Sequence, residues 1–394
     1  MPELEAYLAD WLSLLLRWAH IVVGIAWIGA SFYFIWLDNH LESSADPKLS
    51  GDLWAVHGGG FYHVEKFKDA PPQMPARLHW FMWEAYWTWF TGFFLLALIY
   101  YAGAELYLID PSVMPLSKGA AIGIGLGSLV VGMVVYEGLC RSSLARNDAA
   151  LGAVMFFVLA AAAWGLCQVF GGRGAFIHYG AVLGTIMVAN VAHIIIPGQR
   201  RMVEALAAGR APDPKDGAAG KQRSVHNTYF TLPVLFTMIS SHYAFTFGTR
   251  WNWLVLVALT LAGGLIRVWF VMRHKGIAPA WPIATGLGLI VVLGILVAPR
   301  TEKSLQSDVK FQAVKSIIDA RCLGCHAAKP SFPGIAEAPK GVMLDTPERI
   351  RAQASIIQSQ SVIAKAMPPG NLTAMTEQER GLLDRWYRSG ARTE

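Results

Sequence analysis

The stretch Cys322-Leu323-Gly324-Cys325-His326 decides how the C-terminal part of this 394-residue chain folds. The spacing C-x-x-C-H is the attachment pattern of a c-type haem. Two thiols separated by two residues can reach the two vinyl groups on one edge of the porphyrin, and the adjacent His326 then lies under the iron as one axial ligand. The chain has no second C-x-x-C pair, so a zinc site is the weaker interpretation. We expect one covalently bound haem c, attached through Cys322 and Cys325.

The second axial ligand of the iron is expected to be Met367, in the run Ala366-Met367-Pro368-Pro369-Gly370-Asn371. Histidine and methionine are the ligand pair of the cytochromes c, and this pair raises the reduction potential. The prolines fix the backbone and hold the thioether in one direction. Met343 and Met375 are alternatives, but Met343 fits core packing and Met375 a contact at the start of the last helix. The predicted metal ligands are therefore His326 and Met367.

The segment that follows residue 308 resembles the small bacterial class I cytochromes c. The resemblance rests on the C-x-x-C-H motif, the Met-Pro-Pro run and an expected last helix over residues 376–389. It implies a small helical cytochrome c domain over residues 309–394. A linker over residues 301–308 is expected to join this domain to the first 300 residues.

Residues 1–300 have the composition of a membrane domain. The whole chain is 54% hydrophobic and 15% charged, with a mean hydropathy of +0.39, whereas soluble globular proteins carry about 25% charged residues. A helix that crosses a bilayer needs about 20 mostly apolar residues. We therefore predict an all-α fold, in which an eight-span transmembrane helix bundle precedes the cytochrome domain. The eight predicted spans are Trp11–Leu37, His79–Tyr101, Lys118–Leu139, Ala149–Phe170, Phe176–Pro197, Tyr229–Gly248, Trp251–Met272 and Pro282–Ala298.

Basic residues between the predicted spans indicate the topology. Eight spans place both ends of the chain on one side of the membrane. If the N-terminus lies outside, the inside loops hold 14 Lys and Arg residues and the outside loops hold three, which is a clear positive-inside bias. The acidic start of the chain lacks the basic region of a signal peptide, so the first span is expected to be retained. We predict a multi-pass protein of the bacterial inner membrane, with the N-terminus and the cytochrome domain in the periplasm.

Two of the predicted inside loops are long. Residues Asn39–Leu78 contain Gly58-Gly59-Gly60 and are expected to form an ordered cap or hairpin. Residues Gly198–Asn227 are basic and rich in Gly and Pro near their middle, which predicts a mobile loop.

Histidines inside predicted spans are the notable ionisable group, because such side chains are costly in a bilayer and usually functional. His20 with His242 could ligate an outer b-type haem, and His79 with His193 could do the same at a deeper level. The alternative is that these histidines hydrogen-bond neighbouring helices or line a polar substrate cavity. Spacing on separate helices does not distinguish the two interpretations.

Other polar residues of the spans suggest a substrate site. Arg267 is the best-placed cation for an anionic ligand that enters from the inside, and Asn190 and Asn227 add amide groups near the same level. Glu84, His79 or His193 could serve as the general base. The composition also suits lipid and a small-molecule substrate as partners, and the sequence carries no nucleic-acid-binding motif.

Two membrane stretches, together with the terminal cytochrome segment, carry a family resemblance. The first is Arg17-Trp18-Ala19-His20 followed by Gly24-Ile25-Ala26-Trp27-Ile28-Gly29, and the second is His226-Asn227-Thr228-Tyr229-Phe230-Thr231-Leu232-Pro233-Val234 running on to Ser241-His242-Tyr243. On these residues the chain resembles the bacterial membrane-bound, cytochrome c-linked urate oxidases, also called urate hydroxylases.

The resemblance implies that urate is oxidised to 5-hydroxyisourate in the transmembrane domain. It also implies that electrons pass through the c-type haem to the respiratory chain, by way of an external cytochrome c or a terminal oxidase, so that no hydrogen peroxide is made. Two other functions fit the same sequence features. One is a quinol-linked cytochrome c reductase, and the other is a permease or sensor with a tethered cytochrome.

Overall fold

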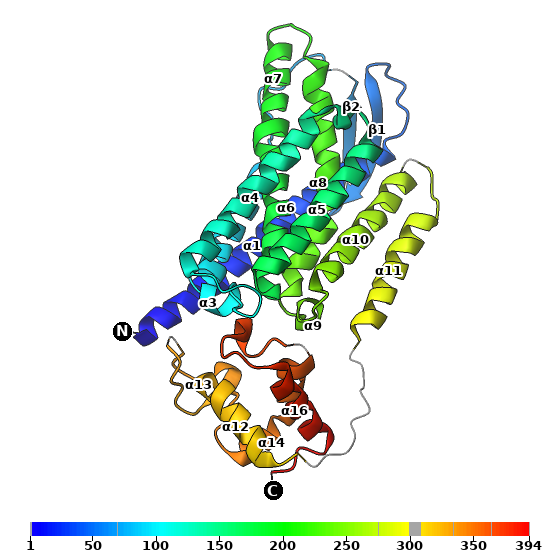
Figure 1. Cartoon of the computed structure of the whole chain (residues 1–394). Coiled ribbons are helices and arrows are strands. Elements are labelled where there is room, and N and C mark those ends of the chain that lie inside the picture. Colours follow the sequence, from blue (N-terminus) through cyan, green and yellow to red (C-terminus); the bar gives the residue numbers. More distant parts are fainter. Residues whose placement is uncertain are drawn as a thin grey trace.

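The computed structural model describes residues 2–68, 70–274, 276–298, 309–333, 335–363 and 365–393. A long helical bundle formed by residues up to 298 and a smaller helical domain that starts at residue 309 lie end to end (Figure 1). The predicted linker over residues 301–308 lies outside the described residues.

The bundle consists of long helices with short turns between them. Its long helices are α1 (Pro2–His40), α2 (Trp83–Leu95), α4 (Lys118–Arg141), α5 (Asp148–Val169), α6 (Gly172–Ala189), α7 (Ile196–Ala207), α8 (Pro214–Ser240), α10 (Asn252–His274) and α11 (Trp281–Val297). Two π-helical segments continue helices without a break: η1 (Leu96–Tyr101) follows α2, and η3 (Asn190–Ile195) joins α6 to α7. The short elements are α3 (Ala104–Tyr107), η2 (Ser143–Arg146) and α9 (Ala244–Phe247).

A helix occupies each of the eight stretches that were predicted to span a membrane. Among the described residues, five helices are long and apolar enough to cross a bilayer by length and composition: Tyr7–His40, Lys118–Arg141, Asp148–Val169, Gly172–Ala207 and Asn252–Arg273. Helix α11 is apolar but shorter, with 17 residues. The structure therefore supports a helical membrane domain, and the count of eight spans stays a prediction.

Polar caps fix where several of these helices begin. The Ser117 hydroxyl accepts a hydrogen bond from the Ala120 amide at the start of α4, and the Asn147 side chain does the same for Ala150 in α5. Asp213 caps α8 by accepting from the Lys215 amide. Such side chains satisfy amide groups that have no partner within the first helical turn.

Three predicted boundaries are corrected by the structure. The loop over Gly198–Asn227, predicted to be mobile, is mostly helix, because α7 continues to Ala207 and α8 already begins at Pro214. The span predicted from His79 starts only at Trp83. The span predicted to reach Gly248 ends at Ser240, where the chain turns before α9.

The predicted hairpin in Asn39–Leu78 is confirmed. Strands β1 (Leu49–His57) and β2 (Gly60–Phe67) pair in antiparallel fashion, with His57 opposite Gly60. Gly58 and Gly59 form the two-residue turn with φ of 58° and 81°. Positive φ at both positions is what the favoured tight hairpin turn requires, and glycine adopts it without steric cost.

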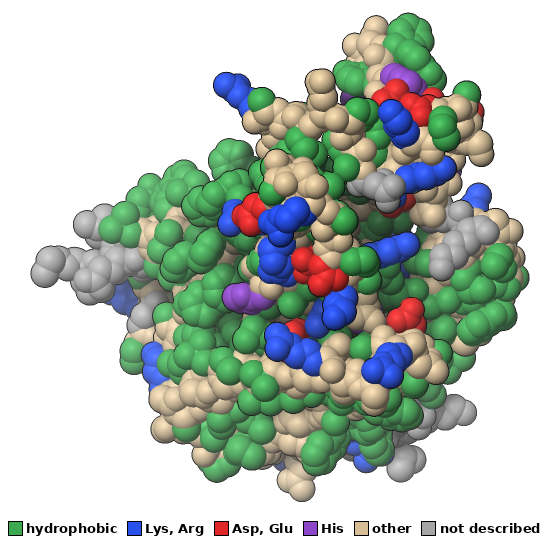
Figure 2. Space-filling model, turned by 90° about the horizontal axis from the view of Figure 1, so that it is seen from above, with side chains coloured by type: hydrophobic (Ala, Val, Ile, Leu, Met, Phe, Trp, Pro, Cys, Tyr) green, Lys and Arg blue, Asp and Glu red, His purple; other side chains and the backbone are tan. Residues whose placement is uncertain are grey.

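Basic side chains gather at one end of the bundle (Figure 2). The N-terminal end of α1 and the C-terminal domain lie at one end, and the hairpin and the α7–α8 turn lie at the other (Figure 1). Figure 2, which views that other end, shows Lys and Arg side chains gathered over it. This arrangement agrees with the predicted positive-inside distribution, in which the C-terminal domain lies outside.

The C-terminal domain packs small helices around one apolar core. Its elements are α12 (Phe311–Arg321), α13 (Leu323–His326), η4 (Pro339–Gly341), α14 (Pro347–Ala352), α15 (Ala354–Ile357), η5 (Gln358–Ile363), η6 (Pro369–Asn371) and α16 (Glu377–Arg388). Val314, Ile318, Leu383 and Trp386 are at most 1% exposed and form the centre.

The last helix of this domain, predicted over residues 376–389, is confirmed. Thr376 and Glu379 form a reciprocal capping box at the start of α16, and Ser389 ends it. Burial acts to raise the pKa of Glu379, but hydrogen bonds from the Thr376 amide and from Arg321 outweigh this effect and lower the pKa. The carboxylate is therefore charged at neutral pH and holds α16 against α12.

Helix α6 lies at the centre of the bundle, and a glycine allows its closest contact. A Cβ added at Gly180 would lie 2.0 Å from the Thr237 hydroxyl and 2.8 Å from its Cβ on α8, whereas a Cβ at Gly184, one turn away, would meet nothing within 4 Å. Small residues let helices approach closely where the apolar environment supplies no other driving force.

We predict that Gly180→Ala destabilises the bundle by about 1–3 kcal/mol through overpacking. Gly184→Ala on the same helix should be neutral or slightly stabilising, because alanine is the better helix former. Thermal unfolding of the detergent-solubilised protein measures both. Equal unfolding temperatures for the two variants would contradict the close α6–α8 contact.

Candidate active site

A chain of polar side chains crosses the bundle in the half that lies away from the C-terminal domain. Asn190 is 2% exposed, and its Nδ2 donates to the Tyr136 hydroxyl at 2.9 Å and to Asn227 Oδ1 at 2.9 Å. Asn227 Nδ2 donates to the Met187 carbonyl at 3.0 Å. The Tyr136 hydroxyl also lies 2.8 Å from His226 Nδ1. Side chains of α4, η3 and α8 thus form one continuous hydrogen-bonded network.

The π-helical segment η3 places Asn190 in this network. Asn190 is its first residue, and Val191 beside it is buried against the bundle. A single wide turn inside an otherwise regular helix shifts the side chains that follow, and such segments are frequent at functional sites.

An ion pair closes the network at the end of α8 that lies away from the C-terminal domain. Arg223 is 4% exposed, its Nη2 lies 2.9 Å from Glu137 Oε2, and its guanidinium carbon lies 5.0 Å from the centre of the Tyr136 ring. Because the charge is paired and also covers an aromatic ring, it is a stable anchor that holds Tyr136 in place.

Arg267 on α10 is a second buried cation, and no ion pair joins it to any residue that the structure describes. Its side chain is 7% exposed, and its guanidinium carbon lies 4.8 Å from the centre of the Phe32 ring on α1. Within the described residues, its Nε and Nη2 atoms are buried without a hydrogen-bond partner. A buried donor that lacks a partner is costly, so this guanidinium has two N–H groups ready for an acceptor that enters the bundle.

Arg267 and the amide network lie on different faces of α8. Gly263, one turn before Arg267, packs against Leu232 and Pro233. Tyr229 on α8 is the electrostatic neighbour of the Arg267 guanidinium. The structure therefore brings Arg267 to the level of Asn227 without a direct contact between the two.

The predicted general bases lie near the same end of the bundle. Glu84 is half-buried at the start of α2, and its carbonyl accepts a hydrogen bond from Thr88. His193 is exposed on η3. A small apolar cluster that includes Ala85 and Val191 joins the start of α2 to η3, so Glu84 and His193 lie on neighbouring segments. His79 is exposed in the loop before α2 and packs edge-on against Phe81.

His20 and His242 occupy different environments. His20 Nδ1 lies 3.0 Å from the Thr91 hydroxyl, which gives His20 the helix-to-helix hydrogen bond that the alternative interpretation predicts. His242 lies exposed in the turn after α8 rather than inside a helix. The bis-histidine ligation of a b-type haem stays a prediction.

The C-x-x-C-H motif folds into the short helix α13, which gives its side chains a defined arrangement. The Cys325 and His326 amides both donate to the Cys322 carbonyl, at 3.2 and 2.9 Å. His326 Nδ1 lies 2.8 Å from the Val342 carbonyl oxygen. A ring nitrogen that donates to a carbonyl leaves Nε2 as the free lone pair, which is how metal-binding histidines are oriented.

The donor set around this motif fits a c-type haem. Both cysteines are free thiols, and burial raises the pKa of the Cys322 thiol to about 12. Arg380 is 5% exposed, and its Nη1 donates to the Met367 carbonyl at 2.9 Å, which holds the methionine loop in place. Two thiols, an imidazole with a free Nε2 and a thioether are the groups that such a haem needs.

Sequence reasoning missed Tyr136 and the Arg223–Glu137 pair. Tyr136-Glu137 is a polar pair at the end of a predicted span, and this unusual placement was the available signal. His226 begins one of the stretches that carry the family resemblance, but only the tertiary structure shows that it shares the Tyr136 hydroxyl with Asn190.

Comparison with known proteins adds one finding. Residues 6–298 match the family model described as urate oxidase N-terminal. Neither the curated proteins nor the solved structures contain a significant match to the chain.

We predict that Tyr136→Phe destabilises the protein by about 1–3 kcal/mol, because it removes the hydroxyl that Asn190 and His226 share. The matched control Tyr33→Phe alters an exposed tyrosine on α1 and should leave the unfolding temperature unchanged. The unfolding temperatures of the two variants and the wild-type protein in detergent provide the measurement. A Tyr136→Phe protein as stable as the control would mean that the network adds nothing to stability.

Proposed function

The chain belongs to the family described as urate oxidase N-terminal, and on this premise we propose that it is a membrane-bound oxidoreductase that oxidises urate to 5-hydroxyisourate. Its electrons go to an external cytochrome c or a terminal oxidase of the respiratory chain, and no hydrogen peroxide is formed. The family match over residues 6–298 carries the choice of urate. The C-x-x-C-H segment, which follows the matched residues, supports the choice of electron acceptor.

The proposed location is the bacterial inner membrane, with the N-terminus and the C-terminal domain in the periplasm. Five long apolar helices support the membrane location. The Lys and Arg residues at the bundle end opposite the C-terminal domain support this orientation (Figure 2).

The reaction sets three tasks for the membrane domain. Urate is a planar monoanion near neutral pH. Its oxidation with one water molecule gives 5-hydroxyisourate, one proton and two electrons. The domain must therefore bind an anion, admit water to one face of the purine and take up a proton.

Arg267 is the proposed anion-binding residue. Its two unpartnered N–H groups are buried beside the Phe32 ring. A guanidinium offers parallel donors that match a planar anion, and charge-assisted hydrogen bonds in a dry site are strong. The binding of urate would give these donors the acceptors that they lack in the free protein.

The Tyr136 network is the proposed proton route. The Tyr136 hydroxyl can pass a proton to His226 Nδ1 at 2.8 Å, and His226 is half-buried near the bundle end that faces the cytoplasm in this orientation. Asn190 and Asn227 hold the hydroxyl in place. Glu84, His79 and His193 are the proposed alternatives for the base that first accepts the proton.

Cys322, Cys325, His326 and Met367 are the proposed haem-binding residues. The two thiols would form the thioether links, His326 Nε2 and the Met367 sulfur would be the axial ligands, and the Val342 carbonyl fixes the imidazole. A haem bound there supplies a one-electron acceptor. The residues of the chain would hold the haem in a domain that belongs to the same polypeptide as the membrane bundle.

We predict that Arg267→Met raises the KM for urate by about 10–100-fold and leaves the haem content unchanged. An increase of this size corresponds to the loss of the charge-assisted hydrogen bonds that Arg267 would donate to urate. Arg273→Met alters an exposed arginine on the same helix and should change neither quantity. Steady-state urate oxidation with an artificial electron acceptor provides the measurement. A normal KM in Arg267→Met would remove Arg267 from the binding site.

The haem content is predicted to be one c-type haem per chain, and the double variant Cys322→Ala/Cys325→Ala should lose the covalent attachment, because it removes both thiols. The pyridine haemochrome spectrum distinguishes c-type from b-type haem. An additional b-type component, lost in His20→Ala, would instead assign His20 to a second haem.

The overall proposal is tested with washed membranes that contain the protein. Urate should reduce the haem, as seen in its alpha absorption band. Reduction by quinol with no response to urate would indicate the quinol-linked reductase instead.

A further inference from the structure

The C-terminal domain touches the membrane bundle through the turn that follows Met367. Element η6, formed by Pro369–Asn371, meets α3 at the end of the bundle (Figure 1). Gly370 lies at the centre of this contact and faces backbone carbonyl groups of residues that end α3 and follow it.

Only glycine fits at this position. Gly370 has φ of +54°, and an added Cβ would lie 2.7 Å from the Ile109 carbonyl oxygen and 3.3 Å from that of Leu106. Both neighbours are backbone atoms, so neither can rotate away from a larger side chain. The contact is therefore a close one between backbone atoms, in which a turn without a side chain at Gly370 packs against the carbonyl groups of the bundle.

The docked turn and the Met367 loop are held as one unit by Arg380. Its Nη1 donates to the Met367 carbonyl at 2.9 Å, and its Nη2 donates to Asn371 Oδ1 at 3.2 Å. Across the contact, Asp110 of the bundle is an electrostatic neighbour of the same guanidinium. A shift of the turn relative to α3 would therefore also shift Met367.

Aromatic rings lead from the contact into the bundle. Tyr107 of α3 stands in the sequence between Leu106 and Ile109, whose carbonyl groups face Gly370. Its ring centre is 6.3 Å from that of Tyr100. The Tyr100 ring centre is 6.5 Å from that of His178, which is completely buried. Arg173 lies over both tyrosine rings, at 4.8 Å from Tyr107 and 5.9 Å from Tyr100.

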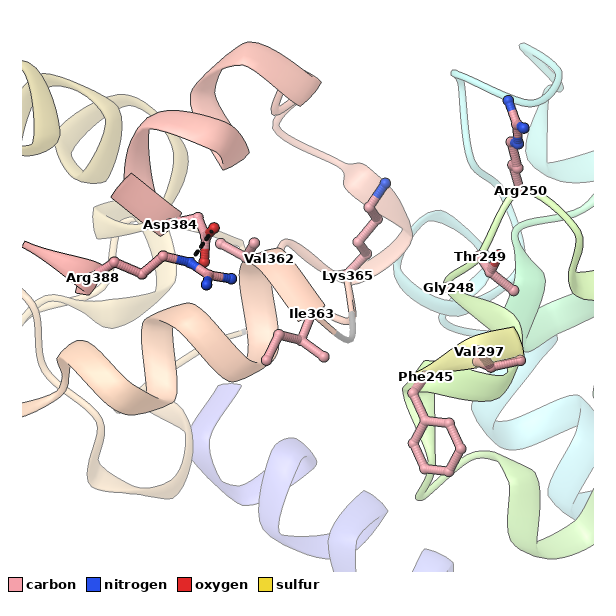
Figure 3. A pocket seen from close by; sticks show the side chains of 10 residues that line it. All are labelled: Phe245, Gly248, Thr249, Arg250, Val297, Val362, Ile363, Lys365, Asp384 and Arg388. Carbon is pink, nitrogen blue, oxygen red and sulfur yellow. Dashed lines mark hydrogen bonds and ion pairs between the residues drawn. The ribbon is translucent and has the colours of Figure 1, made fainter. Parts of the chain in front are cut away.

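The interface beside this contact is open. A cavity of about 370 Å³ lies between the two domains and is lined on the bundle side by the turn after α9 and on the other side by η5 and α16 (Figure 3). Figure 3 shows Lys365 and Arg250 on its opposite walls without a contact between them. The close contact at Gly370 therefore lies beside an open part of the interface.

We propose that the Pro369–Asn371 turn is a docking surface that seats the C-terminal domain on α3, so that electrons from the bundle enter this domain on the side of the Met367 loop. The inference rests on the proposed function, in which urate is the electron donor. Each urate that is oxidised yields two electrons. Each electron that crosses the contact oxidises the bundle side by one electron and reduces the haem by one electron. Gly370 and Asp110 act as positioning residues.

The test compares Gly370→Ala with Gly390→Ala in the full-length protein. Gly390 also has a positive φ, of +96°, in the same domain, but an added Cβ there would meet nothing within 4 Å. The control therefore carries the backbone strain without the clash. Hydrogen–deuterium exchange of the peptide over residues 103–111 reports on docking without any need for urate.

We expect Gly370→Ala to raise exchange in this peptide and to slow the reduction of haem by urate about tenfold or more, since small misplacements of reacting groups have effects of that size. Reduction by ascorbate, the haem content and exchange in α16 should match those of Gly390→Ala. Asp110→Asn leaves the sequence of the C-terminal domain unaltered and should produce the same changes to a smaller extent. This variant replaces Gly370→Ala in the test if Gly370→Ala fails to fold.

Unchanged exchange over residues 103–111 in both Gly370→Ala and Asp110→Asn would overturn the docking surface. Raised exchange with an unchanged rate of urate-driven reduction would overturn the electron entry. If the wild-type protein does not oxidise urate at all, the proposed function fails, and the exchange measurement still decides whether the turn docks on α3.

Discussion

Every polar side chain inside an apolar helix bundle must find its partner within the protein, because the surroundings offer none, and this requirement organises the membrane domain around α8. Asn227 joins Asn190, His226 joins Tyr136, and Arg223 pairs with Glu137. Each contact ties α8 to α4 or to the helix that contains η3. The network therefore serves both as a structural connection between helices and as the proposed proton route.

Arg267 departs furthest from this requirement among the described residues, because Arg223 has one buried nitrogen atom without a hydrogen-bond partner but keeps its ion pair with Glu137. The Arg267 guanidinium is as deeply buried as the side chains of the network, but two of its nitrogen atoms lack partners within the described residues. The Phe32 ring offsets part of the cost of burying the charge. A protein tolerates such a cost where a ligand completes the site, and for a chain of this family the proposed ligand is the urate anion.

The proposed chemistry is divided between the two ends of the molecule. The groups proposed to bind substrate and to carry the proton lie in the half of the bundle away from the C-terminal domain, and the residues proposed to bind haem lie beyond its other end. Between Asn190 and His178 alone the helix advances about 18 Å. Under the proposed function, electrons would have to cover this distance and then leave the bundle. The seating of the C-terminal domain on α3 would then be a functional constraint as well as a structural one.

Some features were predictable because they depend on local sequence. The C-x-x-C-H motif, the capped last helix and the glycine turn of the hairpin each follow from a few neighbouring residues, and apolar length places a helix in every predicted span. The loop over Gly198–Asn227 was mispredicted because its glycines and prolines concealed the Asp213 cap and the Arg201–Asp216 ion pair that stabilise two helix ends.

By itself the sequence determined that the chain is mostly helical, with long apolar helices that suit a membrane, and that it carries a C-x-x-C-H segment after them. Composition, apolar length and the spacing of two thiols and a histidine are properties of the chain alone. Only the tertiary structure decided that Nε and Nη2 of Arg267 are buried without a hydrogen-bond partner among the described residues. It also decided that Tyr136 joins His226 to Asn190 and that Gly370 lies against α3. These contacts join residues distant in sequence, and their existence depends on how the helices pack.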